Sequence, residues 1–131
     1  MDRKYFCPFC DAHLNPSAKI VLIAARASRR ALVLLSPLPG DYDVILPRGF
    51  DLDATDEVTF VCPVCTHSLT SEKDASMAEL RFAGNEEGGS VVFSRVYGRH
   101  ATYVIAEGIV RSFGEHADAD GVNFWGERAG T

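Results

Sequence analysis

The sequence predicts an all-β fold of antiparallel strands and hairpins, a sandwich or a meander with little helix. Short runs rich in β-branched and aromatic residues recur along the chain, and clusters of glycine, proline and asparagine separate them. Residues 91–106 alternate with a period of two, as strands do. The only four cysteines form two matched pairs, Cys7 with Cys10 and Cys62 with Cys65, which predict a site that holds these strands together.

Length and composition limit the class of protein. The chain has 131 residues, of which 47% are hydrophobic and 24% charged, so we predict one globular domain over residues 1–131. A formal net charge of −5 argues against a nucleic-acid partner, because surfaces that follow phosphates are normally basic. No apolar segment approaches the roughly 20 residues of a membrane-spanning helix, and no secretory signal precedes the first cysteine pair. We therefore expect a cytoplasmic protein.

The chain divides into five segments around the two cysteine pairs. We call each pair and its flanking residues a knuckle. The expected segments are knuckle 1 at 5–15, a β insertion at 19–61, knuckle 2 at 61–70, a C-terminal β meander at 77–113 and a loop-rich tail at 114–131.

The insertion is expected to begin with a hairpin. Asn15 and Pro16 would also suit the start of a helix over residues 19–27. The branched residues of that segment favour a strand, which we pair with residues 31–35 across the turn formers between them. Further strands are expected at 42–46 and 57–61, the second leading into knuckle 2.

After knuckle 2 the pattern predicts a short helical turn and then a meander. Residues 70–74 are polar and are expected to form that turn. The strands are expected at 77–82, 91–97, 101–106 and 109–113, with a loop at 84–89. Both faces of the strands within 91–106 are partly apolar, so a second sheet, the insertion or another subunit must cover each face. In the tail, Phe124 and Trp125 are the only bulky apolar pair, and we expect them to pack on the core rather than to anchor a partner.

The cysteine spacing predicts a metal site. Two residues between thiolates let one tight turn present both sulfurs to a single cation, and two such turns complete a tetrahedron. Pro8 and Pro63 each follow the first cysteine of a pair and fix a backbone angle of the turn. Four thiolates suit zinc first and iron second. The predicted ligands are Cys7, Cys10, Cys62 and Cys65.

Other interpretations of these residues stay open. The cysteines could be small buried apolar residues or a redox dithiol, but a dithiol is expected at a strand-to-helix junction, not among β patterns. His13 and His67 follow their pairs at different offsets, so we expect them beside the metal or exposed, not as ligands. His100 is a still weaker candidate for a metal ligand. His116, with Glu115, Asp118 and Asp120, resembles a metal cluster in composition, although a charged loop near a chain end is usually solvated.

The knuckles resemble those of zinc-ribbon and rubredoxin-like proteins. The run Phe60-Val61-Cys62-Pro63-Val64-Cys65 is similar to the second knuckle of rubredoxin, although rubredoxin places glycine after each second cysteine, where this chain has Asp11 and Thr66. The chain is more similar to a group of small bacterial zinc-ribbon proteins in which two Cys-Pro-x-Cys pairs flank a β-rich insertion. The residues that carry this resemblance, besides the pairs, are Leu35, Gly40, Asp41, Tyr42, Leu69, Phe93 and Ser94. It implies zinc and a β fold, and no catalytic residue comes with it.

Together these features predict a zinc-binding structural or interaction protein, not an enzyme. A closed four-thiolate site has no open position for water, and the chain carries no phosphate-binding loop or nucleophile elbow that would indicate a small-molecule substrate. We expect a protein partner or a homo-oligomer formed through the β surface. The alternatives are a redox protein, either a rubredoxin-like iron carrier or a zinc thiol switch, and a nucleic-acid-binding zinc ribbon.

Overall fold

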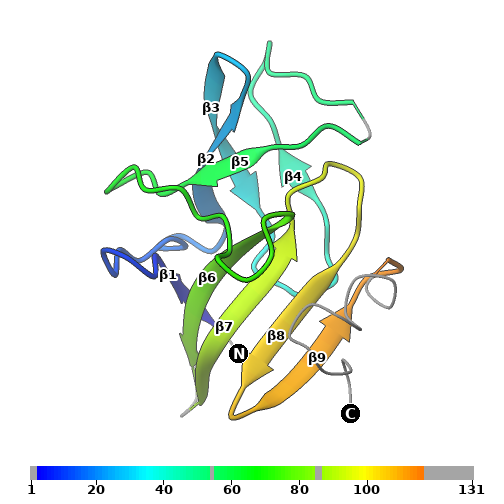
Figure 1. The fold of residues 1–131 in the computed structure, drawn as a ribbon. Coiled ribbons are helices and arrows are strands. Elements are labelled where there is room, and N and C mark those ends of the chain that lie inside the picture. The colour runs from blue at the N-terminus through cyan, green and yellow to red at the C-terminus, as the bar shows by residue number, and fades with distance from the viewer. Residues whose placement is uncertain (1–2, 54, 85–86, 117–131) are drawn as a thin grey trace.

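The computed structural model describes residues 3–53, 55–84 and 87–116, and this part of the chain consists of strands, turns and loops without a helix. Its strands form two antiparallel sheets (Figure 1). The predicted all-β class is therefore confirmed. Within these residues no helix is long and apolar enough to cross a membrane.

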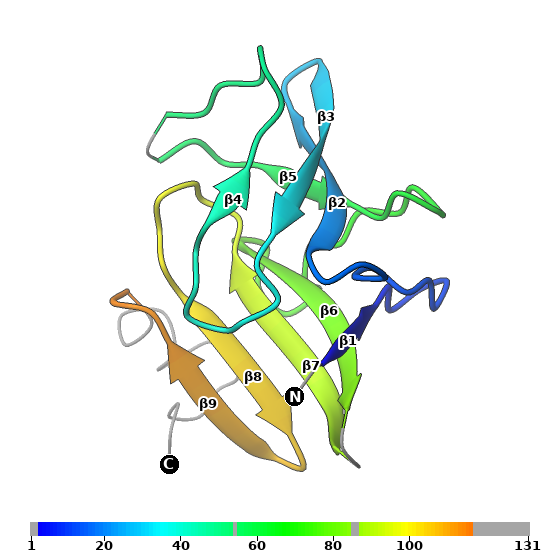
Figure 2. The ribbon, with the colours of Figure 1, turned by 180° about the vertical axis from the view of Figure 1, so that it is seen from behind.

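The two sheets draw their strands from different parts of the chain. The larger sheet has the order β1-β6-β7-β8-β9, with bounds Lys4–Phe6, Met77–Gly84, Glu87–Ser94, Thr102–Ala106 and Ile109–Phe113. The smaller sheet has the order β4-β3-β2-β5, with bounds Val44–Ile45, Arg29–Leu35, Ile20–Arg26 and Thr59–Val61. The first strand of the chain thus joins the C-terminal meander, and the insertion makes a sheet of its own (Figure 2).

The predicted insertion hairpin is present. β2 pairs with β3 from Ile20 opposite Leu35 to Arg26 opposite Arg29, so the β-branched residues outweighed the helix-start signal. The strands predicted at 42–46 and 57–61 are present in shorter form as β4 and β5. Residues 95–97 continue past the end of β7 and bond to the segment before β5, where the N–H of Val58 donates to the carbonyl of Arg95 at 2.8 Å.

The helical turn predicted at residues 70–74 is wrong. Thr70 forms a bridge with Ala78, and the segment between them is a bend and a turn. Side chains hold it: the Asp74 carboxylate accepts from the N–H of Ser76 at 2.9 Å, and the Ser71 hydroxyl accepts from the N–H of Lys73 at 3.2 Å. Such local side-chain bonds compete with helical ones, which explains why the polar segment does not become a helix.

The loop predicted at residues 84–89 is also wrong at both ends. β6 extends through Gly84, and β7 begins at Glu87, which is the partner of Gly84 in the ladder. Gly89 lies inside β7 because no larger residue fits between β7 and β8. A Cβ added there would lie 2.0 Å from the carbonyl oxygen of Ile105. Gly89 is therefore required by the close approach of β7 and β8, not by a turn.

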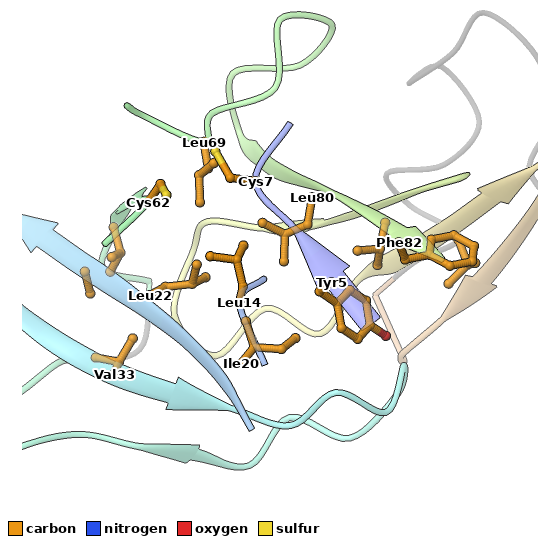
Figure 3. Packing of buried hydrophobic residues seen from close by; sticks show 14 of the residues in the cluster. Tyr5, Cys7, Leu14, Ile20, Leu22, Val33, Cys62, Leu69, Leu80 and Phe82 are labelled. Atoms are coloured by element: carbon orange, nitrogen blue, oxygen red, sulfur yellow. The ribbon is translucent and has the colours of Figure 1, made fainter. Parts of the chain in front are cut away.

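The core lies between the sheets. Alternate residues of β2, namely Ile20, Leu22 and Ala24, face inward and are buried, as is Val33 of β3. The larger sheet contributes Tyr5, Leu80, Phe82, Val91 and Val104 to the same cluster. Figure 3 shows the labelled side chains of both sheets pointing into one interior, with Phe82 and Tyr5 at one end and Cys62 at the other. Burying each large aliphatic side chain contributes roughly 1.5–3 kcal/mol, so the core depends on the two sheets staying together.

The larger sheet is apolar on its second face as well. Met77, Val92, Ala101, Tyr103 and Val110 form a separate buried cluster there. The alternation within residues 91–106 thus leads to two different clusters, with Val91 and Val104 in the core between the sheets and Val92 and Tyr103 in this second cluster.

Candidate metal centre

The structure brings the four predicted cysteines together. Their sulfur atoms all lie within 4.8 Å of one another, and two Sγ–Sγ distances, Cys7 to Cys65 and Cys10 to Cys62, are each 3.7 Å. Four sulfurs placed tetrahedrally about 2.3 Å from one cation lie about 3.8 Å apart. The cysteines are free thiols and not disulfides. Their arrangement is therefore compatible with a single metal ion bound by all four.

The two knuckles have the same kind of backbone turn. In knuckle 1 the N–H of Asp11 donates to the carbonyl of Cys7 at 2.9 Å, and the N–H of Cys7 donates to Ala12 at 3.0 Å. In knuckle 2 the N–H of Thr66 donates to Cys62 at 2.9 Å, and the N–H of Cys62 donates to His67 at 3.1 Å. The matching bonds connect residues at the same offsets from the cysteines, so the repeated sequence encodes a repeated structure.

A left-handed residue follows the second cysteine of each knuckle. Asp11 has φ of 67° and Thr66 has φ of 61°. Both knuckles therefore adopt this backbone conformation without glycine at the position. Aspartate tolerates this conformation comparatively well, whereas for a β-branched threonine it is a strained one.

Each knuckle ends in a leucine that links the two sheets. The N–H of Leu14 donates to Tyr5 of β1 at 2.7 Å, and its carbonyl accepts from Val21 of β2 at 2.8 Å. The N–H of Leu69 donates to Phe60 of β5 at 2.8 Å, and its carbonyl accepts from Glu79 of β6 at 2.8 Å. Both leucines are buried.

The cysteine cluster therefore lies where the chain passes between the sheets. At knuckle 1 the chain leaves the larger sheet and enters the smaller one, and at knuckle 2 it returns. The two knuckle loops, one after β1 and one after β5, project beside each other (Figures 1 and 2). An ion held by all four thiolates would fasten both crossings at once.

Backbone N–H groups and burial set the electrostatics of the sulfurs. The N–H of Phe9 donates to the Cys7 Sγ, and the N–H of Val64 donates to the Cys62 Sγ, both at 3.4 Å. Cys7 and Cys62 are buried, whereas Cys10 is exposed. Burial raises the pKa of the Cys7 thiol to about 12. Burial also acts to raise the pKa of the Cys62 thiol, but hydrogen bonds from the backbone of Cys65 and Val64 and from Cys7 and Cys10 outweigh it, so the pKa of Cys62 is lowered. A bound cation would favour the thiolate form at both positions.

Neither knuckle histidine joins the sulfur cluster. The ring of His13 lies 5.4 Å from that of Phe6, and the ring of His67 stacks on Phe9 at 3.7 Å. The different offsets of the two histidines have a structural reason. His13 forms the bridge to Phe6 that closes knuckle 1, and the corresponding bridge in knuckle 2 joins Val61 to Ser68. Ser68, not His67, is thus the equivalent of His13.

The second histidine group has a different organisation from a metal site. The N–H of His100 donates to the Nδ1 of His116 at 2.8 Å, and the Nδ1 of His100 lies 3.0 Å from a Glu115 carboxylate oxygen. Tyr42 stacks on the His100 ring at a centroid distance of 4.3 Å, a contact that no sequence motif indicated. Among the described residues only the four cysteines form a group that could hold a metal ion. Asp118, Asp120, Phe124 and Trp125 lie outside the described residues.

A comparison with known proteins identifies no relative of this chain. No family model, no curated protein and no solved structure matches the chain. The resemblance of the knuckles to zinc-ribbon and rubredoxin-like proteins therefore stays a prediction. The chain's own structure supports a cluster of four cysteines able to bind a metal ion, located between two antiparallel sheets.

Proposed function

We propose that this protein is a zinc-binding structural and interaction module without a catalytic role of its own. Cys7, Cys10, Cys62 and Cys65 hold the ion, and the observation that carries the proposal is their convergence at the two crossings between the sheets. Four thiolates favour zinc over iron and leave no position at which the metal could activate water. The ion acts as a structural fastener for the interior between the sheets.

The metal itself is the first test of this function. Protein purified without chelator is expected to contain close to one zinc ion per chain by elemental mass spectrometry, with no visible absorption band. Iron with such a band would make the protein an electron carrier. A chain without metal whose thiols form a reversible disulfide would contradict the proposal and indicate dithiol chemistry.

The outer face of the smaller sheet offers the interaction surface. Leu32 of β3 pairs with Ile23 of β2, and Leu34 pairs with both Val21 and Ile45. These five residues, the outer stripe, alternate with the inward-facing residues of their strands. Leu32 is 59% exposed and Ile45 is 51% exposed. The stripe is therefore a continuous apolar surface on a protein whose core is already formed by the opposite face of the same strands.

The side chains of the outer stripe suit contact with another protein and not with nucleic acid. Adjacent exposed aliphatic residues mark contact sites between proteins. A nucleic-acid platform would instead present aromatic side chains and a basic groove, and the stripe has only aliphatic side chains. We propose that the stripe binds a second copy of this chain, because an aliphatic surface of uniform character can be complementary to itself under two-fold symmetry.

Replacing Leu32 by lysine is expected to break this self-association. Sedimentation analysis of the wild-type protein at rising concentration should show a dimer, and the dissociation constant of Leu32→Lys should rise at least about tenfold, because a charge enters an apolar contact. Ile109→Lys is the matched control, since Ile109 is 58% exposed but belongs to β9 of the other sheet. A monomeric wild-type protein, or equal effects of both variants, would contradict the role of the stripe.

A further inference from the structure

A cavity of about 280 Å³ lies between the two sheets. Ala24 and Val33 of the smaller sheet border it on one side, and Leu80 and Val91 of the larger sheet border it on the other. None of the four cysteines lines it. The cavity is thus a feature separate from the metal centre, open on part of its boundary and lined mainly by apolar residues of both sheets and their loops.

β4 and the loop that follows it form part of the cavity wall. β4 contains only Val44 and Ile45, so the smaller sheet ends early at this edge. Val44 and the loop residues Leu46 and Leu52 border the cavity there in place of a longer strand. Tyr42 and His100, which stack on each other, lie in the wall beside them.

Two large polar side chains of the wall, Tyr42 and Arg95, are bonded within the protein. The Tyr42 hydroxyl donates to the carbonyl of Phe113 at 3.1 Å and lies 2.9 Å from the hydroxyl of Thr102. The Arg95 guanidinium donates from Nε to the carbonyl of Val58 at 2.9 Å. Groups that are satisfied in this way do not require a charged partner. The charged residues of the wall are two acids, Asp41 and Asp43, and two bases, Arg95 and Arg99, so they give it no net charge, and its other residues are mostly apolar. The cavity therefore favours a ligand that gains from leaving water and carries no charge.

We propose that the cavity binds a neutral, largely apolar small molecule. A dry apolar cavity of about 150 Å³ accepts benzene, so one of this size accommodates about eleven non-hydrogen atoms, the size of a bicyclic aromatic or a medium-chain alcohol. This binding is independent of the outer stripe and goes beyond the structural role of the metal. No sequence motif indicates it, because its lining residues come from strands and loops distributed over most of the chain.

The probe for this site is 2-naphthol, a fluorescent molecule that is neutral at pH 7 and has the expected size. Its fluorescence should change on titration with the metal-loaded protein and saturate at one probe per chain. Decanol should displace it, because the cavity selects for apolar volume and not for an aromatic ring. The absence of saturable binding would overturn the proposal.

Substitutions at neighbouring positions of β4 locate the binding. Val44→Phe places a larger side chain in the cavity and is expected to weaken 2-naphthol binding at least tenfold. Ile45→Phe places the same side chain on the opposite face, where it should leave the affinity unchanged. Leu52→Phe, in a loop without strand pairing, provides a second occluding variant if Val44→Phe fails to fold.

Two further measurements separate the cavity from other sites. All variants should retain the metal content and far-ultraviolet circular dichroism of the wild-type protein, so that lost binding is not lost folding. Leu32→Lys should bind 2-naphthol normally. A probe that adsorbs to the outer stripe would instead be lost in Leu32→Lys and kept in Val44→Phe, and this result would also overturn the proposal.

Discussion

Cys10→Ser is expected to abolish zinc binding and to lower the free energy of unfolding severely, although Cys10 is the exposed member of the cluster. If the cysteines served only as small buried residues, this exposed change would be nearly neutral. As a ligand, Cys10 supports a binding free energy on the order of 10 kcal/mol, comparable to the whole net stability of a small domain at roughly 5–15 kcal/mol. Urea unfolding, followed together with metal content, measures the loss.

The control for this prediction uses the metal-free state. After treatment with a strong chelator, wild-type protein and Cys10→Ser should unfold alike, because the exposed side chain then contributes little. Cys62→Ser should remain less stable than both, because Cys62 also packs in the core. If Cys10→Ser keeps a full equivalent of zinc and the wild-type midpoint, the four-thiolate site is wrong.

Gly89→Ala is expected to destabilise the larger sheet by at least about 2–3 kcal/mol, a large effect for one methyl group. The added Cβ would lie 2.0 Å from the carbonyl oxygen of Ile105 and 3.1 Å from the Cα of Ala106. Backbone atoms cannot move aside as a flexible side chain can, so β7 and β8 must separate. Denaturant unfolding of the metal-loaded protein measures the change, and amide exchange should be fastest in β8.

The neighbouring glycine is the matched control. A Cβ at Gly88 would meet only the carbonyl oxygen of Phe82, at an ordinary distance of 3.5 Å. Gly88→Ala should therefore be neutral or stabilise the protein by up to about 1 kcal/mol, since it reduces the freedom of the unfolded chain. Equal losses in both variants would show that composition of the strand matters, not the approach of β8 to Gly89.

The cysteine cluster could be predicted because the information is local. Each Cys-Pro-x-Cys motif determines its own turn, and the only long-range requirement is that two such turns meet. The β2–β3 hairpin was predictable for the same reason, from branched residues on both sides of a short turn. No equivalent local signal indicates the pairing of β1 with β6, which joins segments far apart in the chain.

The wrong predictions concern residues whose type favours one local structure but whose contacts in the molecule favour another. Gly88 and Gly89 suggested a turn by their type, but the position of Ile105 in β8 explains why Gly89 is needed. The segment at 70–74 suggested a helical turn by polarity, but the side chains of Ser71 and Asp74 bond to the adjacent backbone instead. The cavity could not be predicted at all, because it depends on how the two sheets sit against each other.

The sheet crossings also have a consequence for biosynthesis. Knuckle 1 leaves the ribosome before knuckle 2, and Phe6 must wait for Arg81, its partner in β6. At about 5–20 residues per second, the segment between Cys10 and Cys62 takes roughly 3–10 seconds to translate. During this interval Cys7 and Cys10 form a nascent dithiol with an incomplete ligand set. Metal capture is therefore expected only after knuckle 2, at the middle of the chain, has emerged, and until then the growing polypeptide is most vulnerable to oxidants at Cys7 and Cys10.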